Sequence, residues 1–198
     1  MKFYDRTQEL DLLRDINKQS RNTACFTVMV GRRRIGKTSL LLESMKGEKF
    51  LYLFVSRKSE VLLCAQFQHE IKDSLELEIF GNVTEFRILF EQLMIYATQT
   101  HFTLIIDEFQ EFDNINSSIF SDIQNIWDRY KEQAKINFIA CGSIYSMMKK
   151  IFENNKEPLF GRLTSKIILK PFSVSTIKEI LKDYNPKYTP EDLLAFYL

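Results

Sequence analysis

The sequence predicts an α/β fold in which a mainly parallel, five-stranded sheet is covered by helices. Short apolar runs of strand length alternate with helix-forming segments, as in parallel sheets whose strands are buried on both faces. One such run, 25–30, leads through a glycine-containing loop directly into a helix-forming segment. Another, 102–106, ends abruptly in two adjacent carboxylates, which belong at the edge of a sheet rather than inside it.

The expected elements follow from the spacing of apolar residues along the chain. The strands are predicted at 25–30, 50–56, 102–106, 136–141 and 166–169. A first helix is expected to be capped by Asp5 with Gln8 as its reciprocal partner, and Thr189 is expected to cap the last helix. Further helices are predicted near 39–45, 59–75, 84–97, 118–134, from 144, and at 175–183.

Composition narrows the class of protein. With 198 residues, 45% of them hydrophobic and 27% charged, the chain suits one well-filled soluble domain with the beginning of a second. Its apolar runs are too short to span a membrane and its start lacks the apolar core of a signal peptide, so we expect a cytoplasmic protein without a membrane partner. Three cysteines show no metal-type spacing, and a net charge of +1 gives no global nucleic-acid footprint.

The loop after the first strand carries the strongest chemical signal. It has a glycine, four residues and then Gly-Lys-Thr, the pattern of a phosphate-binding P-loop between a strand and a helix. Backbone N–H groups of such a loop surround phosphates, Lys37 reaches the β- and γ-phosphates from an exposed position, and the Thr38 hydroxyl binds magnesium. The alternative is a chance match in an ordinary turn. The predicted ATP-binding residues are Gly31, Arg32, Arg33, Arg34, Ile35, Gly36, Lys37, Thr38 and Ser39.

The strand at 102–106 supplies the second signal, because it ends in Asp107 and Glu108. Ligands of open α/β sheets bind at the carboxyl ends of the strands, so Asp107 is expected to share the magnesium with Thr38. Glu108 is then the candidate base that orients and polarises the attacking water. An apolar run that ends in Asp-Glu can also be a plain loop start, and the upstream P-loop makes the catalytic interpretation the better one.

Two further residues have one functional and one structural interpretation each. Ser143 follows the strand 136–141 and either bonds the γ-phosphate or water, or caps the helix that begins near Ile144. Arg162 lies in a loop before the last strand, and we expect it near the edge of the sheet. It either forms a surface salt bridge or neutralises charge on a γ-phosphate, in its own subunit or in a neighbour.

Together these motifs resemble the archaeal-type ATPase family, within the AAA+ and STAND branches of P-loop NTPases. The loop 31–40 is similar to its arginine-rich Walker A motif, 104–110 to its Walker B motif, and Ser143 to its sensor. The opening residues Phe3, Asp5 and Arg6 resemble its adenine-side motif, and the segment around Arg162 resembles the one that holds an arginine finger. The resemblance implies a three-layer P-loop NTPase sandwich with strand order 5-1-4-3-2, and ATP or ADP with Mg2+ as cofactors.

The resemblance also bears on domains and partners. It implies an ATPase core at 1–172 and the start of a helical lid at 173–198, and the apolar end without a stop signal suggests a truncated chain. In this family a lid, a winged helix and often a nuclease-like domain follow. A homo-oligomer, DNA or a protein partner engaged through such domains is therefore expected.

Three functions are compatible with these residues. The first is a Mg2+-dependent ATPase in which nucleotide binding and hydrolysis drive a conformational switch. The second is a nucleotide-gated signalling switch or scaffold with very slow turnover. The third is a P-loop kinase, which is disfavoured because a carboxylate beside the metal promotes attack by water. Physical reasoning from the sequence does not separate ATP from GTP.

Overall fold

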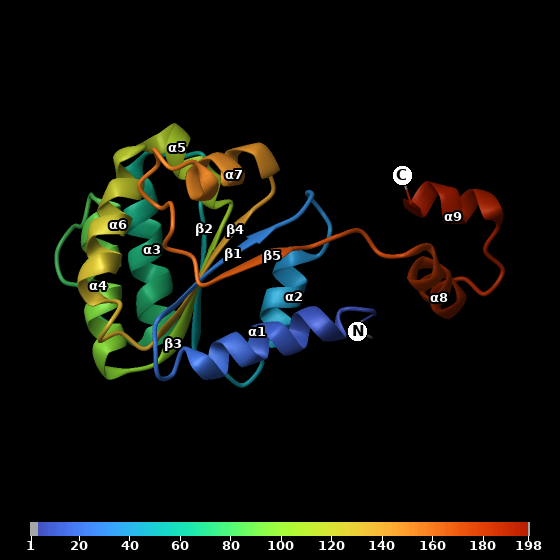
Figure 1. Cartoon of the computed structure of the whole chain (residues 1–198), viewed down its shortest axis with the longest axis horizontal. Helices are drawn as coiled ribbons and strands as arrows, with labels where there is room; N and C mark the ends of the chain where they lie inside the picture. The colour runs from blue at the N-terminus through green and yellow to red at the C-terminus, as the bar shows by residue number, and fades with distance from the viewer. Residues whose placement is uncertain (1–3, 198) are drawn as a thin grey trace.

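The computed structural model describes residues 4–197 and has three layers, with a parallel five-stranded sheet between two layers of helices (Figure 1). The strand order is β2-β3-β4-β1-β5, and every pairing is parallel. Counted from the opposite edge, this is the order 5-1-4-3-2 that the family resemblance implies, so the predicted fold class is confirmed. The strands are β1 (Cys25–Val30), β2 (Phe50–Phe54), β3 (Phe102–Asp107), β4 (Ile136–Gly142) and β5 (Ser165–Ile168).

The helices divide between the two faces of the sheet. On one face lie α1 (Thr7–Gln19) and α2 (Lys37–Ser44), and on the other lie α3 (Glu60–Leu75), α4 (Phe86–Gln99), α6 (Ser118–Tyr130) and α7 (Tyr145–Glu153). A 3-10 turn η1 (Phe109–Glu111) and a short helix α5 (Phe112–Ile115), which sequence reasoning did not predict, connect β3 to α6. The last helices are α8 (Val174–Tyr184) and α9 (Pro190–Tyr197).

Burial of the strands explains why the sheet forms. Every residue of β1, β3 and β4 is buried, because these strands lie inside the sheet and helices cover both of their faces. The larger core contains stacked Phe26 and Phe138 rings, whose centroids are 4.2 Å apart. Trp127 packs with its ring centroid 5.2 Å from that of Phe26 and is 2% exposed, so it is part of this core. This packing fixes the positions of the strand ends, where the polar residues of the candidate site lie.

The predicted caps have different outcomes at the two ends of the chain. Helix α1 begins at Thr7 after Arg6, and no side chain caps it. The capping box of Asp5 and Gln8 was therefore wrong: the Asp5 carboxylate instead accepts a hydrogen bond from the Thr176 hydroxyl of α8. At α9 the prediction is confirmed, since the Thr189 hydroxyl accepts from the N–H of Asp192, whose carboxylate accepts in return from the N–H of Thr189.

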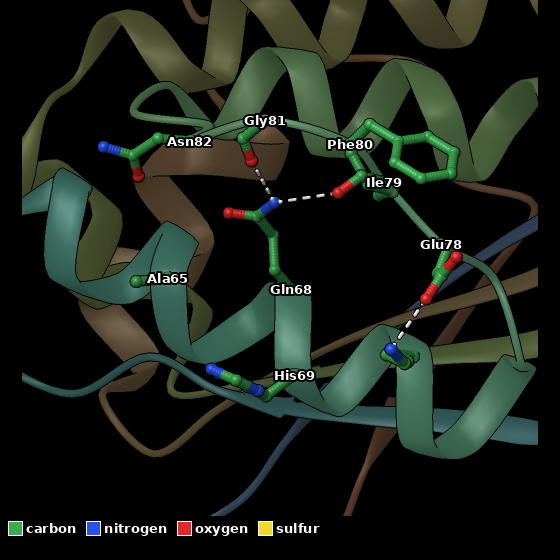
Figure 2. A pocket seen from close by; sticks show the side chains of 9 residues that line it. Ala65, Gln68, His69, Glu78, Ile79, Phe80, Gly81 and Asn82 are labelled. Carbon is green, nitrogen blue, oxygen red and sulfur yellow. Dashed lines mark hydrogen bonds and ion pairs between the residues drawn. The ribbon is translucent and has the colours of Figure 1, made fainter.

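A long loop between α3 and α4 lies along α3 and is held by Gln68, as Figure 2 shows. The side-chain amide of Gln68 donates to the carbonyls of Ile79 and Gly81, at 3.2 and 3.0 Å. The hollow beside it, about 480 Å³, is lined by α3 and this loop, and none of the predicted site residues contributes to it. This hollow is therefore a feature of the helical layer and not of the carboxyl edge of the sheet.

Helices α8 and α9 stand apart from the three layers, beyond the end of β5 (Figure 1). They contact the chain start through Tyr4, whose hydroxyl donates to Asp183 at 2.8 Å, and through the Asp5 bond described above. The division into 1–172 and 173–198 stays a prediction. Within residues 4–197, no helix is long and apolar enough to cross a membrane.

Candidate functional site

The loop between β1 and α2 lies at the carboxyl edge of the sheet, and its shape depends on two left-handed residues. Gly36 has φ of 92° and Arg34 has φ of 64°. Gly31 does not have a left-handed φ. It is needed for space, because a Cβ there would lie 3.1 Å from both the Cβ and the carbonyl of Leu169, just after β5.

Lys37 begins α2 and folds back over the loop. Its Nζ donates to the carbonyls of Gly31 at 2.8 Å and Arg32 at 3.2 Å. Because the ammonium satisfies these carbonyls, the side chain is only 7% exposed, and the expectation of an exposed lysine was wrong. Arg32, Arg33 and Arg34, by contrast, are exposed. The loop thus holds one buried cation at its centre, where a phosphate would lie.

Asp107, the last residue of β3, joins the loop to the sheet. Its Oδ2 accepts from the Thr38 hydroxyl at 3.0 Å and from the Tyr52 hydroxyl at 2.7 Å, and its Oδ1 accepts from the N–H of Glu108 at 2.9 Å. The structure therefore brings together the two residues that the sequence assigned to magnesium. Burial, and then Asp107 itself, raise the pKa of Tyr52 well above its usual range, so this hydroxyl remains a donor.

The oxygen donors at this point fit a magnesium ion. The Thr38 hydroxyl and the Asp107 carboxylate are hard ligands, and magnesium in nucleotide sites takes few protein ligands beside phosphates and water. Over the part of the chain that the structure describes, no cluster of three or more His, Cys, Asp or Glu residues could hold a metal by itself. The pair is thus suited to a metal that arrives with the nucleotide.

Glu108 has the strained backbone and the partners expected of an active-site group. Its φ is 54°, which is unusual for a residue with a side chain. Its Oε2 accepts from the Ser143 hydroxyl at 2.8 Å and from the side-chain amide of Gln110. Ser143 does not cap α7, whose N-cap is Ile144. The capping interpretation of Ser143 was therefore wrong, and its bond to the γ-phosphate or water stays a prediction.

Gln110 and Tyr52 were not identified from the sequence as site residues. Gln110 is completely buried in η1, and a Cβ on Gly142 would collide with its amide oxygen and with Met148. Tyr52 lies within an apolar run whose pattern predicts a buried strand and gives no sign of a site residue. Its register opposite Ile105 of β3 places it beside Asp107, and this register cannot be obtained from the sequence of either strand alone.

Two cavities lie near these residues. One of about 600 Å³ lies beside the catalytic candidates and is lined by Arg33, Phe54, Val55, Ser56, Arg57, Glu108, Glu111, Ser143 and Ile144. The other, of about 380 Å³, is bounded by residues 5–9 and 170–173.

Residues 3–193 of the chain match the family described as "ATPase domain predominantly from Archaea". The chain belongs to this ATPase-domain family.

This archaeal-type ATPase domain is similar in sequence to one longer protein and in fold to a solved ATPase. An uncharacterized protein of Methanocaldococcus jannaschii is 29% identical over 195 residues, which are 98% of this chain and 41% of that protein. The Walker-type ATPase of Pyrococcus abyssi has a similar fold, with a TM-score of 0.67, 17% identity, and coverage of 96% of this chain and 61% of the other. The chain thus spans less than two thirds of the length of either relative.

Two ORC proteins of Aeropyrum pernix share the fold of this ATPase domain as well. The Aeropyrum pernix ORC2 protein, solved in ADPNP–ADP complexes, matches with a TM-score of 0.70 and 14% identity over 96% of this chain and 55% of its own. The Aeropyrum pernix ORC1 protein, solved in complex with DNA, matches with a TM-score of 0.65 and 10% identity over 94% and 50%. At these identities the likeness concerns the P-loop NTPase fold alone.

The smaller cavity of the ATPase domain is where the adenine-side residues were predicted. Arg6 is only 6% exposed, donates to the carbonyl of Lys170 at 2.8 Å and lies 4.4 Å from the centroid of the Phe172 ring. Its guanidinium is thus held by the protein and forms part of the cavity wall. Asp5 also lines this cavity, whereas Phe3 lies outside the described residues.

Arg162 is not part of this site within one chain. Arg162 precedes β5. Thr164, two residues further along, bonds Phe26 near the start of β1, so this loop lies at the amino edge of the sheet, opposite the P-loop. Its guanidinium donates to Asp128 of α6 at 2.7 and 3.0 Å and to the carbonyls of Pro158 and Phe160. The expectation that it reaches a phosphate of its own subunit was wrong; a role between subunits stays a prediction.

Proposed function

We propose that this ATPase domain binds ATP with Mg2+, hydrolyses it to ADP and phosphate, and couples the two states to a conformational switch of the AAA+ and STAND type. One observation carries the proposal. The Thr38 hydroxyl lies 3.0 Å from Asp107, while the adjacent Glu108 lies 2.8 Å from Ser143. Phosphate, metal and water chemistry would therefore meet at one point of the carboxyl edge.

Each group has a distinct part in this reaction. The loop amides and Lys37 hold the β- and γ-phosphates, and Lys37 exchanges its bonds to the loop carbonyls for bonds to phosphate oxygens. Thr38 and Asp107 would hold Mg2+, which would withdraw charge from the phosphate oxygens. Glu108 accepts a proton from water and orients it toward the γ-phosphate, and Ser143 keeps the carboxylate of Glu108 in place.

The adenine is proposed to occupy the cavity between the chain start and residues 170–173. Arg6 stacked on Phe172 forms one wall there, and the carboxyl end of β5 brings this wall next to Gly31. The segment 173–198 is proposed to be the beginning of a lid. Since Asp5 bonds Thr176 of α8, a base bound in the cavity would contact the same residues that hold the lid.

A second candidate function is a switch that holds nucleotide for long periods and turns over very slowly. Its support is the Glu108 carboxylate, one oxygen of which already accepts hydrogen bonds from both Ser143 and Gln110. A carboxylate oxygen that already accepts two hydrogen bonds from the protein has no lone pair left to accept one from water. A P-loop kinase receives less support, since a carboxylate next to the metal favours water as the acceptor.

Partners are proposed from the relatives. The fold is shared with an ORC1 protein solved with DNA, which supports DNA as a partner of the complete protein. A homo-oligomer is the other proposal, and it would give Arg162 a phosphate to reach in a neighbouring subunit. Both proposals concern contacts with other molecules that the described residues do not include.

Nucleotide-dependent melting tests the proposal directly. Saturation with ATP or ADP at a hundredfold over the dissociation constant should add about 2.7 kcal/mol of stability. The shift with ATP should require Mg2+ for its full size, and phosphate release should follow at a measurable rate. If the protein co-purifies with nucleotide and releases little phosphate, the switch is the better description. Absence of any shift with ATP, ADP and GTP would refute both.

A further inference from the structure

Tyr52 makes a contact to the metal-binding carboxylate that neither the motif nor the family match assigns. Its hydroxyl donates to Asp107 Oδ2 at 2.7 Å, which is shorter than the 3.0 Å bond of the Thr38 hydroxyl to the same oxygen. We propose that Tyr52 is a positioning residue, whose hydroxyl holds the Asp107 carboxylate in the orientation that Mg2+ binding requires. This inference rests on the proposed function, since it concerns the metal that accompanies the nucleotide.

The hydrogen bonds of Asp107 show why its orientation matters. A carboxylate has about four lone-pair positions. Oδ2 receives two donors, Tyr52 and Thr38, and Oδ1 receives the N–H of Glu108. The lone pair that remains is on Oδ1, and its direction depends on all three donors. Without the Tyr52 hydroxyl, Oδ2 would be held only by the Thr38 hydroxyl, which is itself a proposed Mg2+ ligand.

Tyr52 itself is rigid enough to act as a reference. It lies in β2, which pairs with β3 over its whole length, and its ring packs partly buried against the core between the sheet and helices α1 and α2. The backbone pairing places residue 52 two positions before Phe54, the partner of Asp107, so both side chains point to the same face. The hydroxyl thus reaches Asp107 from the neighbouring strand β2, on the same carboxylate oxygen that accepts from Thr38.

The alternative is that Tyr52 merely fills space in the core. Tyr52→Phe separates the two roles, because it keeps the ring and removes only the hydroxyl. Tyr96→Phe is a matched control. The Tyr96 hydroxyl accepts from Lys49 at 2.8 Å and donates to the carbonyl of Leu75 at 3.3 Å, away from the site. Both variants lose one hydrogen-bonded tyrosine hydroxyl and keep the aromatic ring.

The test is a Mg2+ titration followed by nucleotide-dependent melting, with a non-hydrolysable ATP analogue at fixed concentration. Loss of a group that orients a metal ligand typically costs about 10- to 100-fold in metal affinity. We expect the half-saturating Mg2+ concentration of Tyr52→Phe to rise by this factor, while nucleotide affinity in EDTA stays within about twofold. Tyr96→Phe should match the parent in both. A Mg2+ midpoint of Tyr52→Phe within twofold of the parent overturns the inference.

A double-mutant comparison keeps the inference testable by a second route. In an Asp107→Asn background, Tyr52→Phe should have no further effect on the Mg2+ midpoint, because the two residues act through one contact. Independent, additive effects would show that Tyr52 acts elsewhere. An equal loss of affinity with and without Mg2+ would also overturn the positioning role. If the parent itself shows no Mg2+-dependent shift, the proposed function fails instead.

Discussion

Replacement of Glu108 by glutamine removes the proposed base and changes little else. In the structure one carboxylate oxygen of Glu108 accepts from both Ser143 and Gln110. A glutamine side chain has the same length, and its amide oxygen can accept both bonds, so no buried donor is left unpaired. The left-handed backbone at this position, with φ of 54°, is retained as well. The variant should therefore fold and bind ATP with Mg2+ nearly as the parent does.

The loss of turnover can be estimated from the chemistry. A positioned general base contributes about 100-fold or more, so hydrolysis should fall by at least tenfold and by about 100-fold if Glu108 acts alone. A 100-fold loss corresponds to about 2.7 kcal/mol in the activation barrier. Initial rates of phosphate release measure this loss, and melting with ATP and Mg2+ in parallel measures whether binding has survived.

Glu111→Gln is the matched control. Glu111 lines the same cavity three residues along the chain, and its carboxylate pairs with Arg57 at 3.1 Å instead of bonding Ser143. It should keep parental turnover. Unchanged hydrolysis in Glu108→Gln, or an equal loss in the two glutamine variants, would refute the assignment of the base. Loss of ATP binding in Glu108→Gln would show that this residue contributes to the binding of ATP and not only to its hydrolysis.

The other predictions concern the loop, the packing beneath the site and the amino edge. Lys37→Ala should abolish tight ATP binding, measured by melting, and parental binding would refute the P-loop assignment. Gly142→Ala should lower the free energy of unfolding by about 1–3 kcal/mol in urea, because its methyl group overlaps Met148. Arg162→Ala should cost about 1 kcal/mol, since it leaves Asp128 without this ion pair. A turnover loss that mixing with Lys37→Ala protein restores would instead support a role between subunits.

Local sequence predicted those parts of the site whose residues are neighbours along the chain. Gly36, Lys37 and Thr38 are consecutive, and a strand before them and a helix after them leave one compact loop to form. Asp107 and Glu108 follow a buried run that contains no charged residue, so their charges had to lie at its end. These assignments needed no knowledge of how the strands pair.

Errors at single residues came from contacts that the pattern does not encode. Lys37 was expected to be exposed, but the carbonyls of its own loop accept its ammonium hydrogens. Asp5 was expected to cap α1, but a hydroxyl some 170 positions away competes successfully for its carboxylate. In both places a polar group bonds a partner that the residue pattern does not indicate. For Lys37 the partners are carbonyls of its own curved loop, and for Asp5 the partner is a hydroxyl of the distant helix α8.

What the sequence by itself determined is the kind of fold, its strands and helices within a few residues, and the loop and strand end that carry the chemistry. Only the tertiary structure decided that Tyr52 and Gln110 belong to the site and that Arg162 lies at the opposite edge of the sheet. The physical reason is that the order and register of parallel strands depend on packing between segments far apart in the chain. Periodicity identifies a strand, but strand pairing decides which side chains meet at its end.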